Sequence, residues 1–304
     1  MILIVTVNKL NRRSSIPSSF AEQNITGTAL KGFRFEGEEA TNVSNPVLGK
    51  WYKDKNNSFY WGGGLIIESH TLVSVNSNVS NLPVNLPPKY KIGIDLSHHN
   101  DNPDWSAIKN AGIAFCFIKI SEGVGTRDKK AKEHSENAKA NNLKVGYYHF
   151  CRPDTKNGGT IESDSLAEAN EALNIIKALG QADLPLVLDL EDQQNWDTPL
   201  LKDDYLKWIQ IFIEKIKQSD IKVIVYSRKE YLDRKLPSAH DLGNNGLWIS
   251  NYSQKDCDRV LNPTGWQTWA LWQFTESGVI GNNLKLDVNI LKDENLLKLW
   301  PDTK

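Results

Sequence analysis

The stretch PLVLDLED, at residues 185–192, combines a short apolar run with the two acids that close it. A short continuous apolar run of this kind is typical of a strand that is buried on both faces. Residues two apart on a strand face the same side, so Asp189 and Glu191 point together, roughly 6–7 Å apart at Cα. We therefore expect an interior strand with an acidic pair at its carboxyl end.

Seven other apolar runs flank this one. The eight runs are Ile92–Leu96, Ile113–Ile120, Leu143–Phe150, Pro185–Leu190, Ile221–Tyr226, Gly246–Ile249, Trp269–Phe274 and Leu284–Ile290. The first five are separated by stretches of helix-forming composition, such as Asp128–Asn142, Glu162–Leu179 and Asp203–Gln218. Strand–helix alternation argues for a parallel sheet with helices outside it, and eight strands suggest a closed barrel. The later gaps are short and rich in Gly, Asn and Pro, so we expect an α/β barrel whose final crossovers lack full helices.

Residues 71–89, TLVSVNSNVSNLPVNLPPK, have the composition of a linker. They carry no charge before Lys89, are rich in Asn and Ser, and contain a Pro pair near their end; such a segment is extended and poorly able to bury a core. We place a linker at 76–89. It would join a small domain at 1–75, whose short β-type runs and Gly turns predict an all-β fold, to the barrel at 90–304.

Charge and composition exclude several classes of protein. Thirty-six basic and 37 acidic residues leave a formal charge of −1, which gives no electrostatic footprint for nucleic acid or an anionic membrane. No apolar run approaches the ~20 residues of a membrane span. The apolar start has no basic region before it and is interpreted as a strand rather than a secretory signal. Cys116, Cys151 and Cys257 are expected to be buried thiols rather than a disulfide framework.

Four acids lie at strand ends, where the chemistry of such barrels takes place. They are Asp95 in KIGIDLSHHN, Asp189 and Glu191 in PLVLDLED, and Asp287 in KLDVNIL. A carboxyl crowded by other carboxylates has a raised pKa, which suits a general acid. Acids after strands also serve as helix caps or salt-bridge partners. For any one of the four acids taken alone, such a structural role is about as frequent as a catalytic one. The four together favour an active site.

Aromatic residues gather at the same strand ends, namely Tyr147, Tyr148, Tyr226, Trp248, Tyr252 and Trp272. Sugar rings stack on such side chains, although any one of them alone is better explained by core packing. His149 and Cys151, two apart at a strand end, could suggest a thiol nucleophile or a ligand pair. We expect a core pair instead, because no family signature surrounds them. No set of residues has metal-ligand spacing, so we expect neither a metal nor a diffusible cofactor.

Residues 90–292 resemble glycoside hydrolase family 25, the lysozymes of the Chalaropsis type. The resemblance is carried in order by GIDLSHHN (93–100), FIKISEG (117–123), GYYHF (146–150), LVLDLED (186–192), VIVYS (223–227), LWISNY (247–252), LWQFTESG (271–278) and LDVN (286–289). It implies an irregular (β/α) barrel with five β/α units and three further strands. It also implies an enzyme, a lysozyme or N-acetylmuramidase that cleaves the β-1,4 bond between N-acetylmuramic acid and N-acetylglucosamine.

The same resemblance implies roles for individual residues. Glu191 would be the catalytic acid/base, supported by three carboxylates, Asp95, Asp189 and Asp287. The sugar sites would be lined by Tyr147, Tyr226, Trp248, Tyr252 and Gln273. Where the family has W-x-A-x-Y, this chain has Trp248 to Tyr252 with Ser250 in place of the alanine, a departure that would alter a subsite without touching the acids.

The first domain resembles bacterial Src-homology-3-like modules. The likeness is carried by LNRRSSIPSS (10–19), ITGTALKGFRFEGE (25–38) and GKWYKDKNNSFYWGGGLI (49–66). In proteins of this class such modules commonly bind cell wall. The alternative is a small β domain that docks to another protein or to a delivery apparatus.

Two alternatives to a muramidase stay open at this point. One is a catalytically inactive wall-binding protein, and the other is a glycosidase that acts on chitin-like polymers of N-acetylglucosamine. The expected partner is bacterial peptidoglycan, without nucleic acid or membrane, and we expect a monomer. With no signal peptide visible, the enzyme would be made in the cytoplasm and would reach the periplasmic or extracellular wall after lysis or by non-classical export.

Overall fold

The computed structural model describes residues 2–18, 23–40, 50–68, 79, 82–84, 86–87, 89–192, 200–281 and 284–292. The chain divides into two compact units, Met1–Ser74 and Val75–Lys304, and each is considered by itself. Parts of the predicted linker (76–78, 80–81, 85 and 88), and residues 293–304 of the predicted barrel domain, lie outside the described residues.

The first unit is a seven-stranded sheet whose strands all pair antiparallel, in the spatial order β3-β2-β6-β5-β4-β1-β7. Its strands are β1 (Ile2–Val5), β2 (Lys9–Arg13), β3 (Ile25–Leu30), β4 (Arg34–Glu39), β5 (Trp51–Asp54), β6 (Phe59–Trp61) and β7 (Leu65–Glu68). A small apolar core of Val5, Leu10, Ala29 and Tyr60 lies between them. The expected all-β character of this part is confirmed.

The second unit is a closed barrel of eight strands. They are β8 (Lys91–Leu96), β9 (Phe115–Glu122), β11 (Lys144–Phe150), β12 (Leu186–Asp189), β13 (Val223–Ser227), β14 (Gly246–Ser250), β15 (Leu271–Ile280) and β16 (Leu284–Leu291). Neighbours from β8 to β15 pair parallel in sequence order, and β16 runs antiparallel between β15 and β8, which closes the ring. A short strand β10 (Thr126–Arg127) is added to β9.

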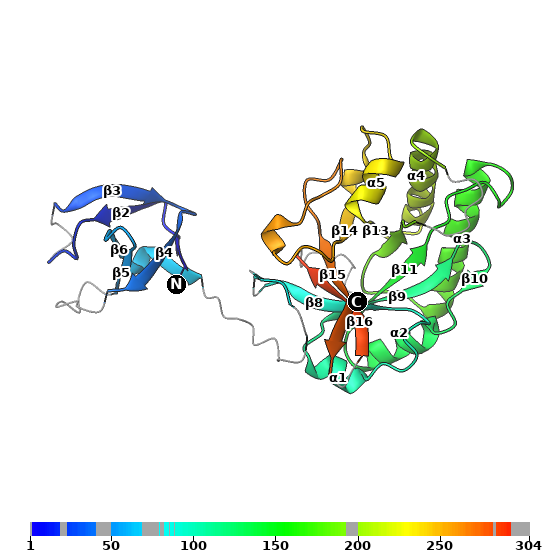
Figure 1. Ribbon diagram of the computed structural model, residues 1–304, viewed down its shortest axis with the longest axis horizontal. Helices are drawn as coiled ribbons and strands as arrows, with labels where there is room; N and C mark the ends of the chain where they lie inside the picture. The colour runs from blue at the N-terminus through cyan, green and yellow to red at the C-terminus, as the bar shows by residue number, and fades with distance from the viewer. Residues whose placement is uncertain are drawn as a thin grey trace. The chain divides into compact units, whose positions relative to one another are not determined.

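Five helices follow the first five barrel strands and lie outside the ring (Figure 1). They are α1 (Trp105–Asn110), α2 (Ala131–Ala140), α3 (Ile161–Leu179), α4 (Asp203–Lys217) and α5 (Lys229–Lys235). Among the described residues beyond β14, a short 3₁₀ turn (Cys257–Arg259) is the one helical element, and β15 pairs antiparallel with β16. The expected five β/α units followed by three further strands are confirmed. None of the described helices is long and apolar enough to cross a membrane.

The sequence begins and ends these helices in recognisable ways. The longest, α3, starts with a reciprocal pair in which Thr160 accepts from the backbone N–H of Ser163 and the Ser163 hydroxyl accepts from that of Thr160. This arrangement satisfies two backbone donors that the first turn leaves unpaired. Helix α3 ends at Gly180, whose positive φ of 86° suits glycine,.

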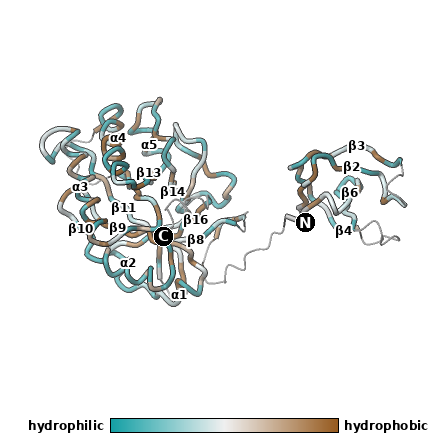
Figure 2. Tube along the Cα trace, turned by 180° about the vertical axis from the view of Figure 1, so that it is seen from behind, coloured by the Kyte–Doolittle hydropathy of each residue, from teal (hydrophilic) through white to brown (hydrophobic). Residues whose placement is uncertain are grey.

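Two apolar layers hold the barrel. The inner layer fills the ring and includes Phe115, Phe117 and Val187. The outer layer lies between strands and helices and includes Cys116 and Ile118. Alternate residues of β9 therefore serve opposite layers, as the period of two along a strand requires. Figure 2 shows the hydrophobic colour along strands such as β13, whereas α2 is mostly hydrophilic.

Candidate active site

A pocket of about 210 Å³ opens at the carboxyl ends of the barrel strands. It is lined by Asp95, Tyr148, Val187, Asp189, Glu191, Tyr226, Trp248, Tyr252, Gln273, Glu276 and Asp287. Eight of the nine site residues expected from the sequence are in this set, and all four acids are among them. The parallel strands present these side chains at one end of the barrel, where side chains from different strands converge.

The first acidic pair stands on one side of the pocket. Asp189 is the last residue of β12 and Glu191 follows two residues later, and their carboxyl groups hydrogen-bond to each other. Burial raises the pKa of Asp189 well above its ordinary value, and the neighbouring Glu191 carboxylate raises it further. Burial also raises the pKa of Glu191. The Oδ1 atom of Asp189 is buried and has no hydrogen-bond partner among the described residues, so it can accept a donor from a bound ligand.

The second acidic pair comes from opposite ends of the second unit's sequence. Asp95 of β8 and Asp287 of β16 are direct partners in the antiparallel register, and their side chains hydrogen-bond. Burial raises the pKa of Asp95, and hydrogen bonds from Asn289 and Gln273 oppose that rise. For Asp287, burial and the charge of Asp95 raise the pKa to about 9.

A chain of hydrogen bonds connects Asp95 to the tyrosines on the aromatic side of the pocket. Its Oδ2 accepts from Gln273 Nε2 at 3.0 Å and from Asn289 Nδ2 at 2.7 Å. The Oε1 of Gln273 in turn accepts from the hydroxyls of Tyr226 at 2.6 Å and Tyr252 at 2.7 Å. The two tyrosines therefore fix the Gln273 amide, and that amide fixes the carboxylate.

Two cations moderate the acidity of the first pair. The Lys119 charge lowers the pKa of both Asp189 and Glu191, and the Arg228 charge lowers that of Glu191. Lys119 is a mostly buried residue of β9, whereas Arg228 is the residue before α5. Both effects oppose the rise in pKa that burial causes.

Comparison with known proteins places this barrel in a family. The family model described as glycosyl hydrolases family 25 matches residues 94–283, which cover the strands that carry Asp95, Asp189 and Glu191. The chain belongs to glycosyl hydrolases family 25. The resemblance of residues 90–292 to this family, seen in the sequence, is confirmed.

Relatives within family 25 share the barrel at modest identity. Lysozyme M1 of Streptomyces globisporus is 26% identical over 193 residues, which are 62% of this chain and 63% of that protein. The CTP1L endolysin structure is 30% identical with a TM-score of 0.57 and covers 69% of each chain. A family 25 glycosyl hydrolase from Bacillus anthracis is 26% identical with a TM-score of 0.57, covering 68% of this chain and 92% of its own. The chain thus spans less than two thirds of the Streptomyces lysozyme.

One expected member of the family 25 pocket lies elsewhere. Tyr147 is not among the lining residues: its ring is buried in the outer layer and its hydroxyl bonds to Ser135 Oγ of α2 at 3.0 Å. The reason is strand alternation on β11, where a Cβ on Gly146 would meet the ring of Phe117 inside the barrel. Gly146 and Tyr148 therefore face inward and Tyr147 faces outward, so the expectation for Tyr147 is corrected in favour of Tyr148.

Three residues of the site were not singled out from the sequence. Tyr148 was only part of the aromatic cluster. Glu276 of β15 lies in the pocket as an exposed acid, and Asn289 holds Asp95 from β16. Glu276 lies in the WQFTESG segment and Asn289 in the LDVN segment. Only the register of β15 and β16 against β8 shows where these two side chains point.

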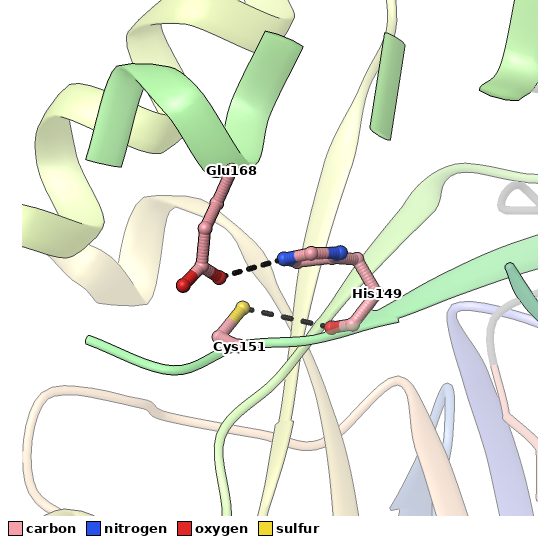
Figure 3. Close-up of side chains that lie close together, drawn as sticks. All are labelled: His149, Cys151 and Glu168. Atoms are coloured by element: carbon pink, nitrogen blue, oxygen red, sulfur yellow. Dashed lines mark hydrogen bonds and ion pairs between the residues drawn. The ribbon is translucent and has the colours of Figure 1, made fainter. Parts of the chain in front are cut away.

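The pair His149 and Cys151 belongs to the outer layer. His149 Nε2 lies 2.8 Å from Glu168 Oε2, and its Nδ1 lies 2.8 Å from Ser121 Oγ. The Cys151 thiol donates to the His149 carbonyl at 3.5 Å (Figure 3). One potential ligand atom from each of His149, Cys151 and Glu168 lies within 4.8 Å of the others, but burial raises the pKa of the thiol well above its ordinary value, whereas metal binding needs a thiolate. These residues tie β11 to α3 and β9, and all three cysteines of the chain are buried without a disulfide.

Proposed function

We propose that this family 25 chain cleaves peptidoglycan at the β-1,4 bond between N-acetylmuramic acid and N-acetylglucosamine. The observation that carries the proposal is the Asp189–Glu191 pair, whose members share one side of the pocket, together with the unpartnered Oδ1 of Asp189. Solved and curated relatives named as lysozymes and an endolysin support this substrate class.

The placement of the pair favours a substrate-assisted reaction. Two carboxylates that flank a glycosidic bond stand on opposite sides of it, about 5–5.5 Å apart in retaining enzymes and ~6.5–9.5 Å apart in inverting ones. Asp189, the last residue of β12, and Glu191, two residues later, instead lie on the same side of the bond. In the proposed reaction the carbonyl oxygen of the sugar's own 2-acetamido group attacks the anomeric carbon. Asp189 Oδ1 accepts the amide N–H, which orients the group and stabilises its developing positive charge.

Glu191 supplies and then recovers the proton. It protonates the leaving glycosidic oxygen while the C–O bond breaks and the cyclic oxazolinium forms. As a carboxylate it then takes a proton from water, which attacks the anomeric carbon and reopens the ring with net retention. Burial raises the pKa of both members of the pair, so the pair keeps a proton at mildly acidic pH,. When the amide N–H of the substrate donates to Asp189, this proton is carried by Glu191.

The aromatic side of the pocket gives it shape. Trp248 is only 2% exposed, and its ring packs against Phe117 at a centroid distance of 4.7 Å and against Tyr226 at 4.9 Å. Trp248 would therefore form the floor of a sugar site rather than a free stacking platform. Tyr252 and Tyr148, which are less buried, would contact the sugar from the sides.

We also propose that the first unit binds the cell wall, in keeping with its likeness to Src-homology-3-like modules. It exposes two large aromatic side chains, Phe33 at 47% and Trp61 at 37%. Residues 75–304 alone should cleave soluble glycan fragments yet be retained less on sacculi than the whole chain. Equal pelleting of both proteins with sacculi would contradict a role in wall binding and would favour docking to a delivery apparatus.

The remaining expectations belong to the same proposal. The enzyme would act as a monomer on bacterial peptidoglycan, in the periplasm or outside the cell, after lysis or non-classical export. No metal or diffusible cofactor would take part, since carboxyl groups suffice for glycoside hydrolysis. Activity that EDTA abolishes and one divalent ion restores would overturn that last point.

Mass spectrometry of muropeptides after digestion of purified sacculi tests the central proposal. New reducing ends that carry muramic acid would support it, and Glu191→Gln should release none above background. N-acetylglucosamine at the new reducing end would instead indicate a different bond specificity. Release of oligomers from chitin alone would indicate the chitin-like substrate, and no release from either polymer would indicate an inactive binding protein.

A further inference from the structure

Asn289 is a buried amide that no step of the proposed reaction uses. It lies on β16 two residues after Asp287, so both side chains face the same side of the strand,. Its side chain is fully buried between two pocket residues. The Nδ2 atom donates to Asp95 Oδ2 at 2.7 Å, and the Oδ1 atom accepts from Trp248 Nε1 at 2.9 Å.

The orientation of this amide is determined by its partners. An indole N–H can only donate, so it must face the oxygen of Asn289, which leaves the NH₂ group for Asp95. Gln273 is oriented in the same way, because two tyrosine hydroxyls donate to its oxygen and its NH₂ group reaches Asp95. Asp95 Oδ2 therefore receives two N–H donors. Hydrogen bonds of this kind favour the ionised form of a carboxyl group.

Asp287 faces the same carboxylate from the other side. The two acids are direct register partners and hydrogen-bond to each other. Carboxylates in contact cannot both be ionised, so one proton belongs to the pair. Since the amides fix Asp95 as the acceptor, Asp287 is the member that holds it.

We propose that Asn289 is a positioning residue, which holds Asp95 as the carboxylate of the pair so that Asp287 carries the shared proton and donates it in a hydrogen bond to an oxygen of the substrate. This inference rests on the proposed glycosidase function and deepens it. The pocket lined by the acid/base Glu191 then also presents an acceptor and a donor side by side.

Burial acts against the ionised form of Asp95. The strands packed around it contribute acids or neutral side chains, namely Cys116 from β9, Tyr148 from β11, Asp189 and Glu191 at the end of β12, Tyr226 from β13, Tyr252 after β14 and Glu276 from β15. Lys119 and Arg228 are the nearby cations; the Lys119 charge acts on Asp189 and Glu191, and the Arg228 charge acts on Glu191. The amides of Asn289 and Gln273, together with the hydrogen bond from Asp287, are thus the groups that hold Asp95 ionised.

The test is the pH profile of kcat/KM for Asn289→Asp on purified sacculi. The substitution keeps the shape and the acceptor for Trp248, and its ionised form presents a negative charge to Asp95 in place of an N–H donor. Asp95 then needs a higher pH to ionise, so the acidic limb should shift upward by about 1 to 2 pH units. The matched control is Asn262→Asp, whose Nδ2 bonds to the Gln267 carbonyl away from the pocket, and its limb should not move.

Folding is checked by circular dichroism for both variants. If Asn289→Asp does not fold, Asn289→Ser gives the same test, because the shorter side chain withdraws the donor without adding a charge. A folded variant of either kind with a loss of rate that is uniform across pH would overturn the proposal and leave Asn289 a purely structural residue. Failure of the wild-type protein to release any glycan product would refute the proposed function instead. Mass spectrometry of the digested sacculi measures that release separately.

Discussion

The ammonium group of Lys119 lies 2.8 Å from Oε2 of Glu122, three residues further along β9. It also lies 4.7 Å from the centre of the Phe150 ring, on the neighbouring strand β11. These two contacts fix a cation close enough to the first acidic pair to lower the pKa of both its members. The cation therefore favours the ionised forms of Asp189 and Glu191.

Lys119→Met should move the acidic limb of the kcat/KM profile to higher pH. Asp189 must be ionised to stabilise the oxazolinium, and loss of the cation raises its pKa, so more alkaline conditions are needed. The profile on sacculi measures the shift. Lys144→Met is the matched control, since that lysine pairs with Asp183 at the opposite end of the barrel, and it should leave the limb in place.

Glu191→Gln should lower the turnover of sacculi by about 10²–10⁴-fold or more, the range typical of a lost general acid. Asp189→Asn should lower the rate nearly as much, because the neutral amide no longer offers a carboxylate that accepts the N–H of the acetamido group and stabilises its positive charge. Release of soluble muropeptides measures both rates. If Asp189→Asn kept most of the activity, the substrate-assisted reaction would be wrong even with the cleavage site intact.

The stereochemistry of the first product gives an independent check. The proposed two-step reaction predicts that proton NMR detects the β-anomer first, followed by mutarotation. An initial α-anomer would contradict the mechanism while leaving the substrate assignment untouched. A glycosyl ester trapped on Asp95, Asp189 or Asp287 would indicate a direct protein nucleophile.

Asp287→Asn should stabilise the fold at neutral and alkaline pH. The pKa of Asp287 is raised from 3.8 to about 9 in the folded state, so between these values the folded state binds more protons than the unfolded one. Stability then falls as pH rises across this window, and below about pH 4 the difference disappears. The amide removes this dependence, and we expect a gain of about 1–3 kcal/mol in the free energy of unfolding at pH 8. Urea titrations at pH 5 and pH 8 would measure this gain. An equal gain at both pH values would contradict the raised pKa of Asp287 in the folded state.

Gly146→Ala should destabilise the barrel by about 1–3 kcal/mol, the usual cost of adding atoms to a packed interior. A Cβ at this position would overlap the ring of Phe117 inside the barrel. Chemical denaturation measures the change. Gly27→Ala, where the added atom meets only the mobile end of the Arg12 side chain, should stay within about 0.5 kcal/mol.

The sequence predicted the order of strands and the acidic cluster because both depend on local signals. Apolar runs marked the strands, and an acid at the end of a run such as PLVLDLED has a fixed place relative to its own strand. The side of the sheet to which Tyr147 and Tyr148 point had no such signal, since the largely apolar run Leu143–Phe150 lacks the polar–apolar alternation that would mark one face. Only the packing of Gly146 against Phe117 decides between them.

Asn289 shows a second limit of sequence reasoning. Nothing local distinguishes this amide from a polar residue at the end of a strand. Its role arises from pairing with strands whose residues lie far away along the chain, Asp95 across 194 positions and Trp248 across 41. Contacts of that kind depend on register, which a single sequence does not display.

The antiparallel strand β16 has a consequence for when the enzyme becomes active. Asp95 stands on the first strand of the barrel and its partners Asp287 and Asn289 on the last one, so a ribosome must release residues 284–291 before the acid pair can exist. Domains fold during synthesis as their residues emerge, yet a nascent chain or a product truncated before residue 287 lacks half of this pair. A cell that makes the protein would thus hold no partly built form with a complete catalytic centre.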